Sequence, residues 1–139
     1  MEKQIAHVSV TGDTSTPQYR QQIATGRHAL TADEPPSNGG ADAGPAPFGY
    51  LLSSLGACTS ITLWMYAQRK GWALGTVSVR LDLFRDANNA LRAERKVLVG
   101  APLTDEQRAR LAEICERTPV TLALKPGITI HTELTIRPS

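Results

Sequence analysis

The chain contains two cysteines, and these are the side chains whose type and position could support covalent chemistry. Cys58 lies within residues 43–68, a stretch without a charged side chain, and Cys115 lies in a later, charge-rich segment. A thiol reacts as the thiolate, and apolar surroundings raise its pKa unless a cation lies nearby. Each cysteine can therefore be interpreted as a reactive group or as a small buried hydrophobe.

Other chemistry has weaker support in the sequence. His7 and His131 fall in predicted strands, opposite the aliphatic side, and together with His28 they lack the spacing of metal ligands. The loop at residues 33–47 is rich in Pro and Gly but contains no Gly-Lys-Ser/Thr sequence that could cradle a phosphate. We therefore expect neither a metal nor a cofactor.

The stretch around Cys58 predicts a long helix. Pro45 and Pro47 suit its start, and Gly71 suits its end, just after Arg69 and Lys70. Because its apolar side chains occur on nearly every side, we expect this helix to be buried. It is long enough to span a bilayer. Its many Gly, Ser and Thr residues and the strand-like flanks favour a core helix instead.

The remaining chain alternates between predicted strands and one further helix. A capping box formed by Thr104 and Gln107 begins that helix, which we expect to reach about Arg117. Period-two alternation and turn residues place the predicted strands at residues 4–10, 18–24, 27–31, 77–83, 90–99 and 127–137. Runs of antiparallel strands punctuated by helices indicate the α+β class. The length of 139 residues fits a single domain over residues 1–139.

Composition narrows the classes of partner. The net charge is +2, with basic and acidic residues scattered rather than gathered in blocks, so we expect no nucleic-acid partner. The first residues lack the apolar core of a signal peptide, so cytoplasm is the expected location, and we expect no membrane partner. A single copy cannot cover a helix that is apolar on all sides. We therefore expect a homodimer.

Three runs of sequence resemble the OsmC/Ohr family, and the likeness is closest to its OsmC-like branch. They follow the family's order and span nearly the whole chain: GRHALTADEP, GGADAGPAPFGYLLSSLGACTSITLWMYAQRKGW and LTDEQRARLAEICERTPV. The resemblance implies an intertwined homodimer in which antiparallel sheets from both chains wrap two central helices. It also implies reduction of organic hydroperoxides by a pair of cysteines.

The resemblance assigns roles to particular residues. Cys58 corresponds to the thiol that reacts with peroxide, and Arg27, beside His28, is the favoured cation for it. Asp33 or Glu34 could orient that arginine.

The sequence also departs from the family pattern at three places. The resolving cysteine normally precedes a Pro-Val pair, and Thr118 stands there in this chain. Phe48 replaces a glutamate of the Ohr branch. Thr121 and Leu122 replace the usual His-Arg pair.

Two functional hypotheses follow. In the first, the protein is a thiol-dependent redox protein in which the Cys58 thiolate attacks the O–O bond of a hydroperoxide. Cys115 or an external thiol then resolves the resulting sulfenic acid. The partners would be a small hydroperoxide and a thiol reductant. In the second, catalysis is lost, and the dimer binds an apolar small molecule in a cleft near Phe48 and Cys58.

Overall fold

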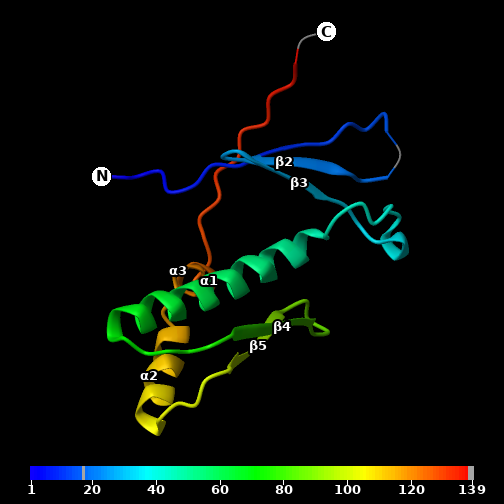
Figure 1. The fold of residues 1–139 in the computed structure, drawn as a ribbon. Coiled ribbons are helices and arrows are strands. Elements are labelled where there is room, and N and C mark those ends of the chain that lie inside the picture. Colours follow the sequence, from blue (N-terminus) through cyan, green and yellow to red (C-terminus); the bar gives the residue numbers. More distant parts are fainter. Residues whose placement is uncertain (17, 138–139) are drawn as a thin grey trace. The chain divides into compact units, whose positions relative to one another are not determined.

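The computed structural model describes residues 1–16 and 18–137, and its helices and antiparallel strands form two compact units. The first unit is Met1–Ser53 and the second is Ser54–Ser139. Helix α1 (Pro47–Lys70) begins in the first unit and continues into the second. The predicted mixture of helices with antiparallel sheet is confirmed (Figure 1).

The first unit contains a three-stranded antiparallel sheet in the order β1 (Ser9–Thr11), β2 (Gln21–Thr25) and β3 (His28–Ala32). Gly26 has a φ of 57°, a left-handed conformation that suits the tight turn between β2 and β3. The first predicted strand was too long, because Ser9 pairs with Ala24 and β2 ends one residue later. Residues 4–7 therefore lie beyond the end of β2.

Helix α1 confirms the predicted helix, but it is not buried on every side. Its buried residues recur one turn apart along one face: Leu55, Thr59, Leu63 and Ala67. The opposite face exposes large apolar side chains, among them Ile61, Trp64 and Met65, each more than half exposed. The helix is long and apolar enough to cross a membrane, by length and composition only. It has a packed face and an open one.

The second unit places a two-stranded hairpin beside the later part of α1 (Figure 1). Strands β4 (Val77–Arg85) and β5 (Leu91–Val99) pair antiparallel along their whole length. The predicted turn is confirmed, with Asn89 at a φ of 65° and the Asp86 carboxylate accepting hydrogen bonds from two turn amides.

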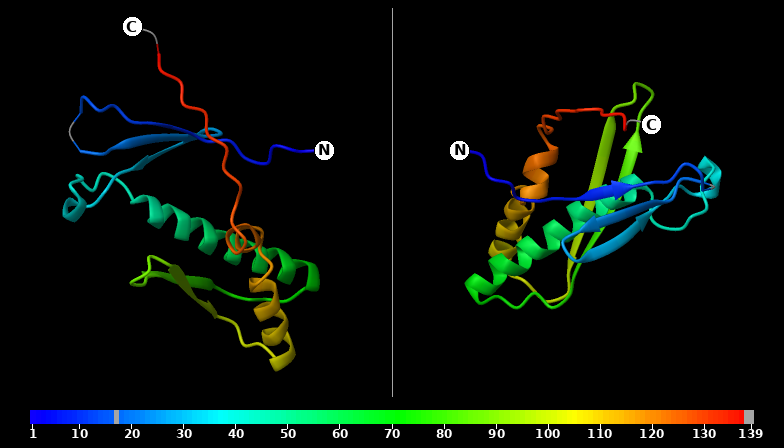
Figure 2. Two further views of the ribbon diagram at one scale, coloured as in Figure 1. Left: turned by 180° about the vertical axis from the view of Figure 1, so that it is seen from behind. Right: turned by 90° about the horizontal axis from the view of Figure 1, so that it is seen from above.

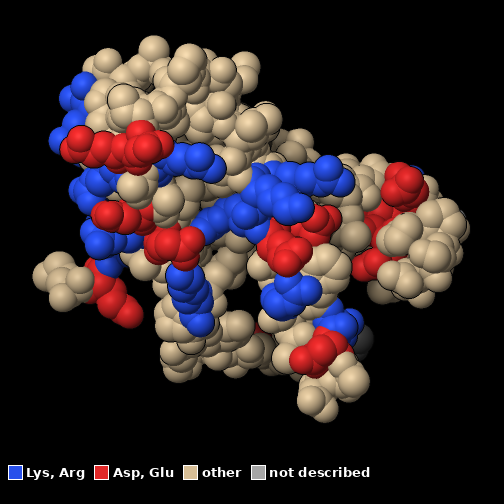
Figure 3. Space-filling view, turned by 90° about the horizontal axis from the view of Figure 1, so that it is seen from below, with Lys and Arg blue, Asp and Glu red and all other residues tan. Residues whose placement is uncertain are grey.

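Figure 3 shows basic and acidic side chains side by side rather than separated into fields of one sign.

Two short helices follow the hairpin (Figure 2). Helix α2 (Asp105–Cys115) begins with the predicted capping box, in which Thr104 and Gln107 cap each other. It ends earlier than expected, because Thr118 is extended ahead of Pro119, the first residue of α3 (Pro119–Leu124). Pro119 thus follows the end of one helix and begins another, as suits a residue without a backbone N–H.

The core of the second unit is an apolar cluster formed by Leu63, Ala67, Leu74 and Leu111. The predicted strand at residues 127–137 is wrong for the described chain, in which these residues form no strand. Its alternating aliphatic side chains are between 66% and 87% exposed rather than turned inward. A strand requires an edge with which to pair, and this segment has found none.

Candidate functional site

Cys58 lies on α1, at the border of the helix's buried face. The residue is half-buried, and its Sγ lies 4.0 Å from the Thr62 hydroxyl, one turn further along. Thr59, the next residue, is completely buried. The thiol is therefore beside the packed face of the helix and is not sealed within it.

The guanidinium of Arg95 is hydrogen-bonded to Thr59, the residue next to Cys58. Arg95 extends from β5, and its side chain is only 13% exposed. Its Nη1 donates to the hydroxyls of Thr59, at 3.0 Å, and Thr121, at 2.9 Å. Its Nη2 donates to the Cys115 carbonyl at 2.9 Å. Four elements thus meet at one side chain, because Thr59 belongs to α1, Cys115 ends α2 and Thr121 lies in α3.

The charge on Arg95 is partly balanced at the protein surface. Its Nη2 also lies 3.4 Å from the Glu116 carboxylate, which accepts a 2.6 Å bond from Lys125. The hydrogen bond from Lys125, and to a lesser extent Arg95, lowers the pKa of Glu116. Glu116 is therefore ionised at neutral pH and contributes a negative charge at the open end of the site.

Sequence reasoning missed Arg95, although a signal was present. Side chains alternate across a strand, so Val97 and Val99 place Arg95 on the same side of β5. Its cross-strand partner is Leu81, which the β4 alternation also places on that side. A charged residue at an inward position of a half-buried hairpin requires partners, and this is the pattern that could have revealed it.

Cys115 is held by different surroundings from those of Cys58. Its carbonyl accepts from Arg95, and the residue packs against the apolar cluster that contains Leu63 and Ala67. Burial raises the pKa of the Cys115 thiol, an effect that the charge of Arg95 partly offsets. Both cysteines are free thiols.

Thr118, which occupies the usual resolving position, is completely buried. Its hydroxyl caps α3 by accepting from the Thr121 amide, and it lies 2.6 Å from the Thr121 hydroxyl. It is therefore connected to Arg95 through Thr121. A hydroxyl network occupies the place where the family pattern has a thiol.

The other residues singled out from the sequence lie in the first unit. Arg27 is exposed in the turn between β2 and β3, with His28 beginning β3. Phe48 is the second residue of α1 and is 46% exposed. These residues therefore belong to a different unit from that of Cys58.

Asp33 organises the loop that precedes α1. It is 2% exposed, and its carboxylate accepts hydrogen bonds from the backbone amides of Glu34, Ala41 and Ala43. These bonds, the one from Ala43 foremost, lower the pKa of Asp33. Its neighbour Glu34 accepts from the Asn38 side chain instead. The Pro- and Gly-rich loop is thus a folded structure with a charged centre.

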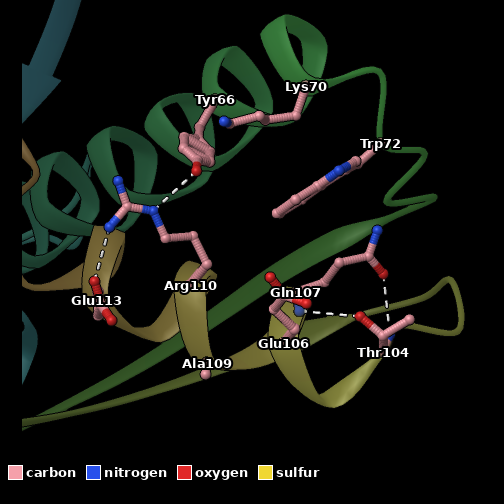
Figure 4. A pocket seen from close by; sticks show the side chains of 9 residues that line it. All are labelled: Tyr66, Lys70, Trp72, Thr104, Glu106, Gln107, Ala109, Arg110 and Glu113. Atoms are coloured by element: carbon pink, nitrogen blue, oxygen red, sulfur yellow. Dashed lines mark hydrogen bonds and ion pairs between the residues drawn. The ribbon is translucent and has the colours of Figure 1, made fainter.

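A cavity of about 600 Å³ lies between the end of α1 and α2 (Figure 4). Arg110 donates to the Tyr66 hydroxyl at 2.9 Å and pairs with Glu113 at 2.8 Å. Tyr66 and Trp72 pack edge to face. Arg110 and Glu113 balance each other's charge, and neither cysteine lines this cavity. Within the residues that the structure describes, no group of three or more His, Cys, Asp or Glu residues could hold a metal ion.

These features define a class of protein, an α+β fold with a half-buried free thiol on its longest helix. A model of the OsmC-like protein family matches residues 39–133, which include both cysteines and Arg95. The chain belongs to this family. No curated protein sequence matches the chain.

Solved structures show the same fold at low sequence identity. An OsmC-like protein from Mycoplasma pneumoniae is 18% identical, with a TM-score of 0.74 over 90% of this chain and 89% of that one. The organic hydroperoxide resistance protein OsmC from Legionella pneumophila is 16% identical, with a TM-score of 0.65 and coverage of 90% and 92%. The organic hydroperoxide resistance protein OhrB of Bacillus subtilis is 17% identical, with a TM-score of 0.58 and coverage of 87% and 90%.

Proposed function

We propose that this protein is a thiol-dependent redox protein that reduces organic hydroperoxides, with Cys58 as the reacting group. The observation that carries the proposal is the half-buried thiol of Cys58, which lies within the family-matched region. Its neighbour in the chain, Thr59, accepts a hydrogen bond from Arg95. Family members named as organic hydroperoxide resistance proteins support the same class of substrate.

The reaction would proceed in two stages. The Cys58 thiolate attacks one oxygen of the peroxide, the O–O bond breaks, and the alcohol leaves with a proton as Cys58 becomes a sulfenic acid. A second thiol, from Cys115 or from an external reductant, then displaces water and forms a disulfide. Arg27 is proposed as the cation that stabilises the Cys58 thiolate, by its position in the family pattern. We place the reaction in the cytoplasm, where thiols stay reduced.

We also propose that the active form is a homodimer. One face of α1 exposes large apolar side chains, and the segment at residues 127–137 carries alternating aliphatic residues without a strand partner. A second copy could cover the helix face and supply an edge for the segment. Light scattering should then give twice the chain mass of 15.0 kDa. A mass of 15.0 kDa at micromolar concentration would contradict the proposal.

Peroxide consumption tests the proposed activity. The purified protein, supplied with dithiothreitol or a dihydrolipoyl reductant, should consume cumene hydroperoxide, and Cys58→Ser should abolish turnover. Arg27→Met should slow the reaction, while substitution of Arg20, another exposed arginine of the same unit, should leave it unchanged. Absence of consumption by the unmodified protein with both reductants would overturn the proposal.

One observation favours a second function, an OsmC-like dimer that binds an apolar small molecule. The start of α1 presents Phe48, an aromatic ring that is 46% exposed, where the Ohr branch has a carboxylate. An apolar ring favours an apolar ligand and would not help to ionise a thiol. A native mass spectrum that shows a co-purifying ligand, together with a Cys58 that resists alkylation, would favour this function over the first.

A further inference from the structure

The two cysteines differ in their relation to the apolar cluster of the second unit. Cys115 packs against a cluster that includes Leu63 and Ala67 on α1. At 3.6 residues per turn, a residue five positions from Cys58 projects about 140° away from it, and one nine positions away projects about 180° away. Leu63 and Ala67 stand at those two distances along the sequence. The side of α1 that contributes to this cluster is therefore the side that Cys58 does not face.

A single side chain fixes this arrangement. The guanidinium of Arg95 bonds Thr59 on α1 and the carbonyl of Cys115 at the end of α2, with distances of 3.0 and 2.9 Å. The same nitrogen that binds Thr59 also binds Thr121 in α3. Because a guanidinium is planar and its donors form a rigid fork, these contacts set the position of the backbone at Cys115 as well as its distance from α1.

We infer that Arg95 is a positioning residue that holds Cys115 in the apolar cluster, so that a sulfenic acid on Cys58 is resolved by an external thiol and not by Cys115. This inference rests on the proposed function, in which either Cys115 or an external thiol resolves the sulfenic acid. It selects the external thiol. The external thiol, a small mono- or dithiol, displaces water from the sulfenic acid and forms a mixed disulfide with Cys58. A second thiol then releases Cys58 as the free thiol and leaves as the oxidised reductant.

The first test measures disulfide formation without peroxide, so that it does not depend on peroxidase activity. Diamide accepts two hydrogens from a pair of thiols that can meet, and peptide mass spectrometry identifies the bond. In the unmodified protein, we expect no disulfide between Cys58 and Cys115. In Arg95→Met, the end of α2 is released and we expect that disulfide at a yield at least tenfold higher. Arg95→Lys, which keeps the charge but not the fork, should give an intermediate yield.

Two further variants separate positioning from general loosening. Thr121→Val removes one acceptor of the guanidinium and keeps the charge, so its disulfide yield should fall between those of the unmodified protein and Arg95→Met. Arg92→Met removes an exposed arginine of the same strand, with a side chain that is 61% exposed, and should leave the yield unchanged. Equilibration in glutathione buffers should give a measurable reduction potential for the cysteine pair in Arg95→Met, a higher potential in Arg95→Lys, and no Cys58–Cys115 disulfide in the unmodified protein.

The second test uses peroxide and a reductant. Cys115→Ser should retain the full rate of hydroperoxide consumption with dithiothreitol, and dimedone should trap a sulfenic acid on Cys58 in both proteins. A Cys58–Cys115 disulfide in the unmodified protein, formed with diamide or with hydroperoxide, would overturn the inference. Absence of that disulfide from both Arg95→Met and Arg95→Lys would also overturn it. A protein that consumes no peroxide, but shows the diamide pattern above, would overturn the proposed function and leave the role of Arg95 standing.

Discussion

Replacement of Thr59 by valine tests whether the buried hydroxyl network stabilises the second unit. Thr59 is completely buried, and its hydroxyl accepts from Arg95 at 3.0 Å while donating to the Leu55 carbonyl at 2.6 Å. Valine has nearly the same shape and a similar helix propensity, so the change removes the hydroxyl without leaving a large cavity. A hydrogen bond to a charged group contributes about 1.5–3 kcal/mol. We expect the free energy of unfolding to fall by about 2 kcal/mol.

The assay is urea denaturation followed by circular dichroism, at one protein concentration because assembly would make stability depend on it. Thr62→Val is the matched control. Thr62 lies on the same helix, is half-buried, and its hydroxyl lies 4.0 Å from the Cys58 sulfur, so we expect a loss below about 0.5 kcal/mol. In an Arg95→Met background, Thr59→Val should cost much less than alone, because the partner of the hydroxyl is gone. Equal effects of Thr59→Val and Thr62→Val would refute the reasoning.

Three further predictions concern other parts of the chain. Thr118→Cys removes the cap of α3 and should cost about 1 kcal/mol by urea denaturation under reducing conditions. After hydroperoxide treatment, peptide mass spectrometry should show a disulfide between positions 58 and 118, because position 118 is where the family pattern has its resolving cysteine. Gly40→Ala should lower the melting temperature, because the new methyl group would meet the Glu34 carbonyl. In Gly49→Ala, within α1, the new methyl group would meet only Pro45, at 3.7 Å, so the free energy of unfolding should rise by up to about 1 kcal/mol. The carboxylate at position 33 has a lowered pKa in the folded state, so its stabilising effect is present at neutral pH and is lost as the pH falls through that lowered pKa. Asp33→Asn should abolish this part of the acid dependence, as measured by denaturation between about pH 2.5 and 6.

Each of the three has an outcome that would contradict it. If the oxidised Thr118→Cys protein gives no peptide in which positions 58 and 118 are joined by a disulfide, position 118 lies away from Cys58. Equal melting temperatures for the two glycine variants would mean that the loop can move aside at Gly40. An Asp33→Asn protein with the same loss of stability in acid would assign that loss to other carboxylates.

The local elements were largely predictable because their signals are contained in short stretches of sequence. The capping box of Thr104 and Gln107 forms as expected, and the absence of charge from residues 43–68 predicted α1. The exposed face of α1 and the unpaired segment at residues 127–137 were not predictable in the same way. Alternation shows that a segment can form a strand, but only a neighbouring edge makes it one.

The site was predicted only in part, for a related reason. Cys58 stands out because a thiol within a charge-free helix is conspicuous in one dimension. Arg95 does not stand out, because its charged neighbours Arg92, Glu94 and Lys96 are typical of a solvent-exposed strand. Its role depends on acceptors that lie between 20 and 36 residues away in the chain. Such long-range hydrogen bonds are a property of packing that periodicity cannot reveal.

The loop before α1 has a consequence for how its sequence can vary among relatives. One carboxylate collects amides from positions 34, 41 and 43, and a side chain at Gly40 or Gly44 would strike main-chain carbonyls across the loop. The shape is therefore specified by Asp33 and these two glycines. Exposed positions between them, such as Ser37 and Asn38, should accept substitution freely, and a library randomised there should yield mostly folded proteins.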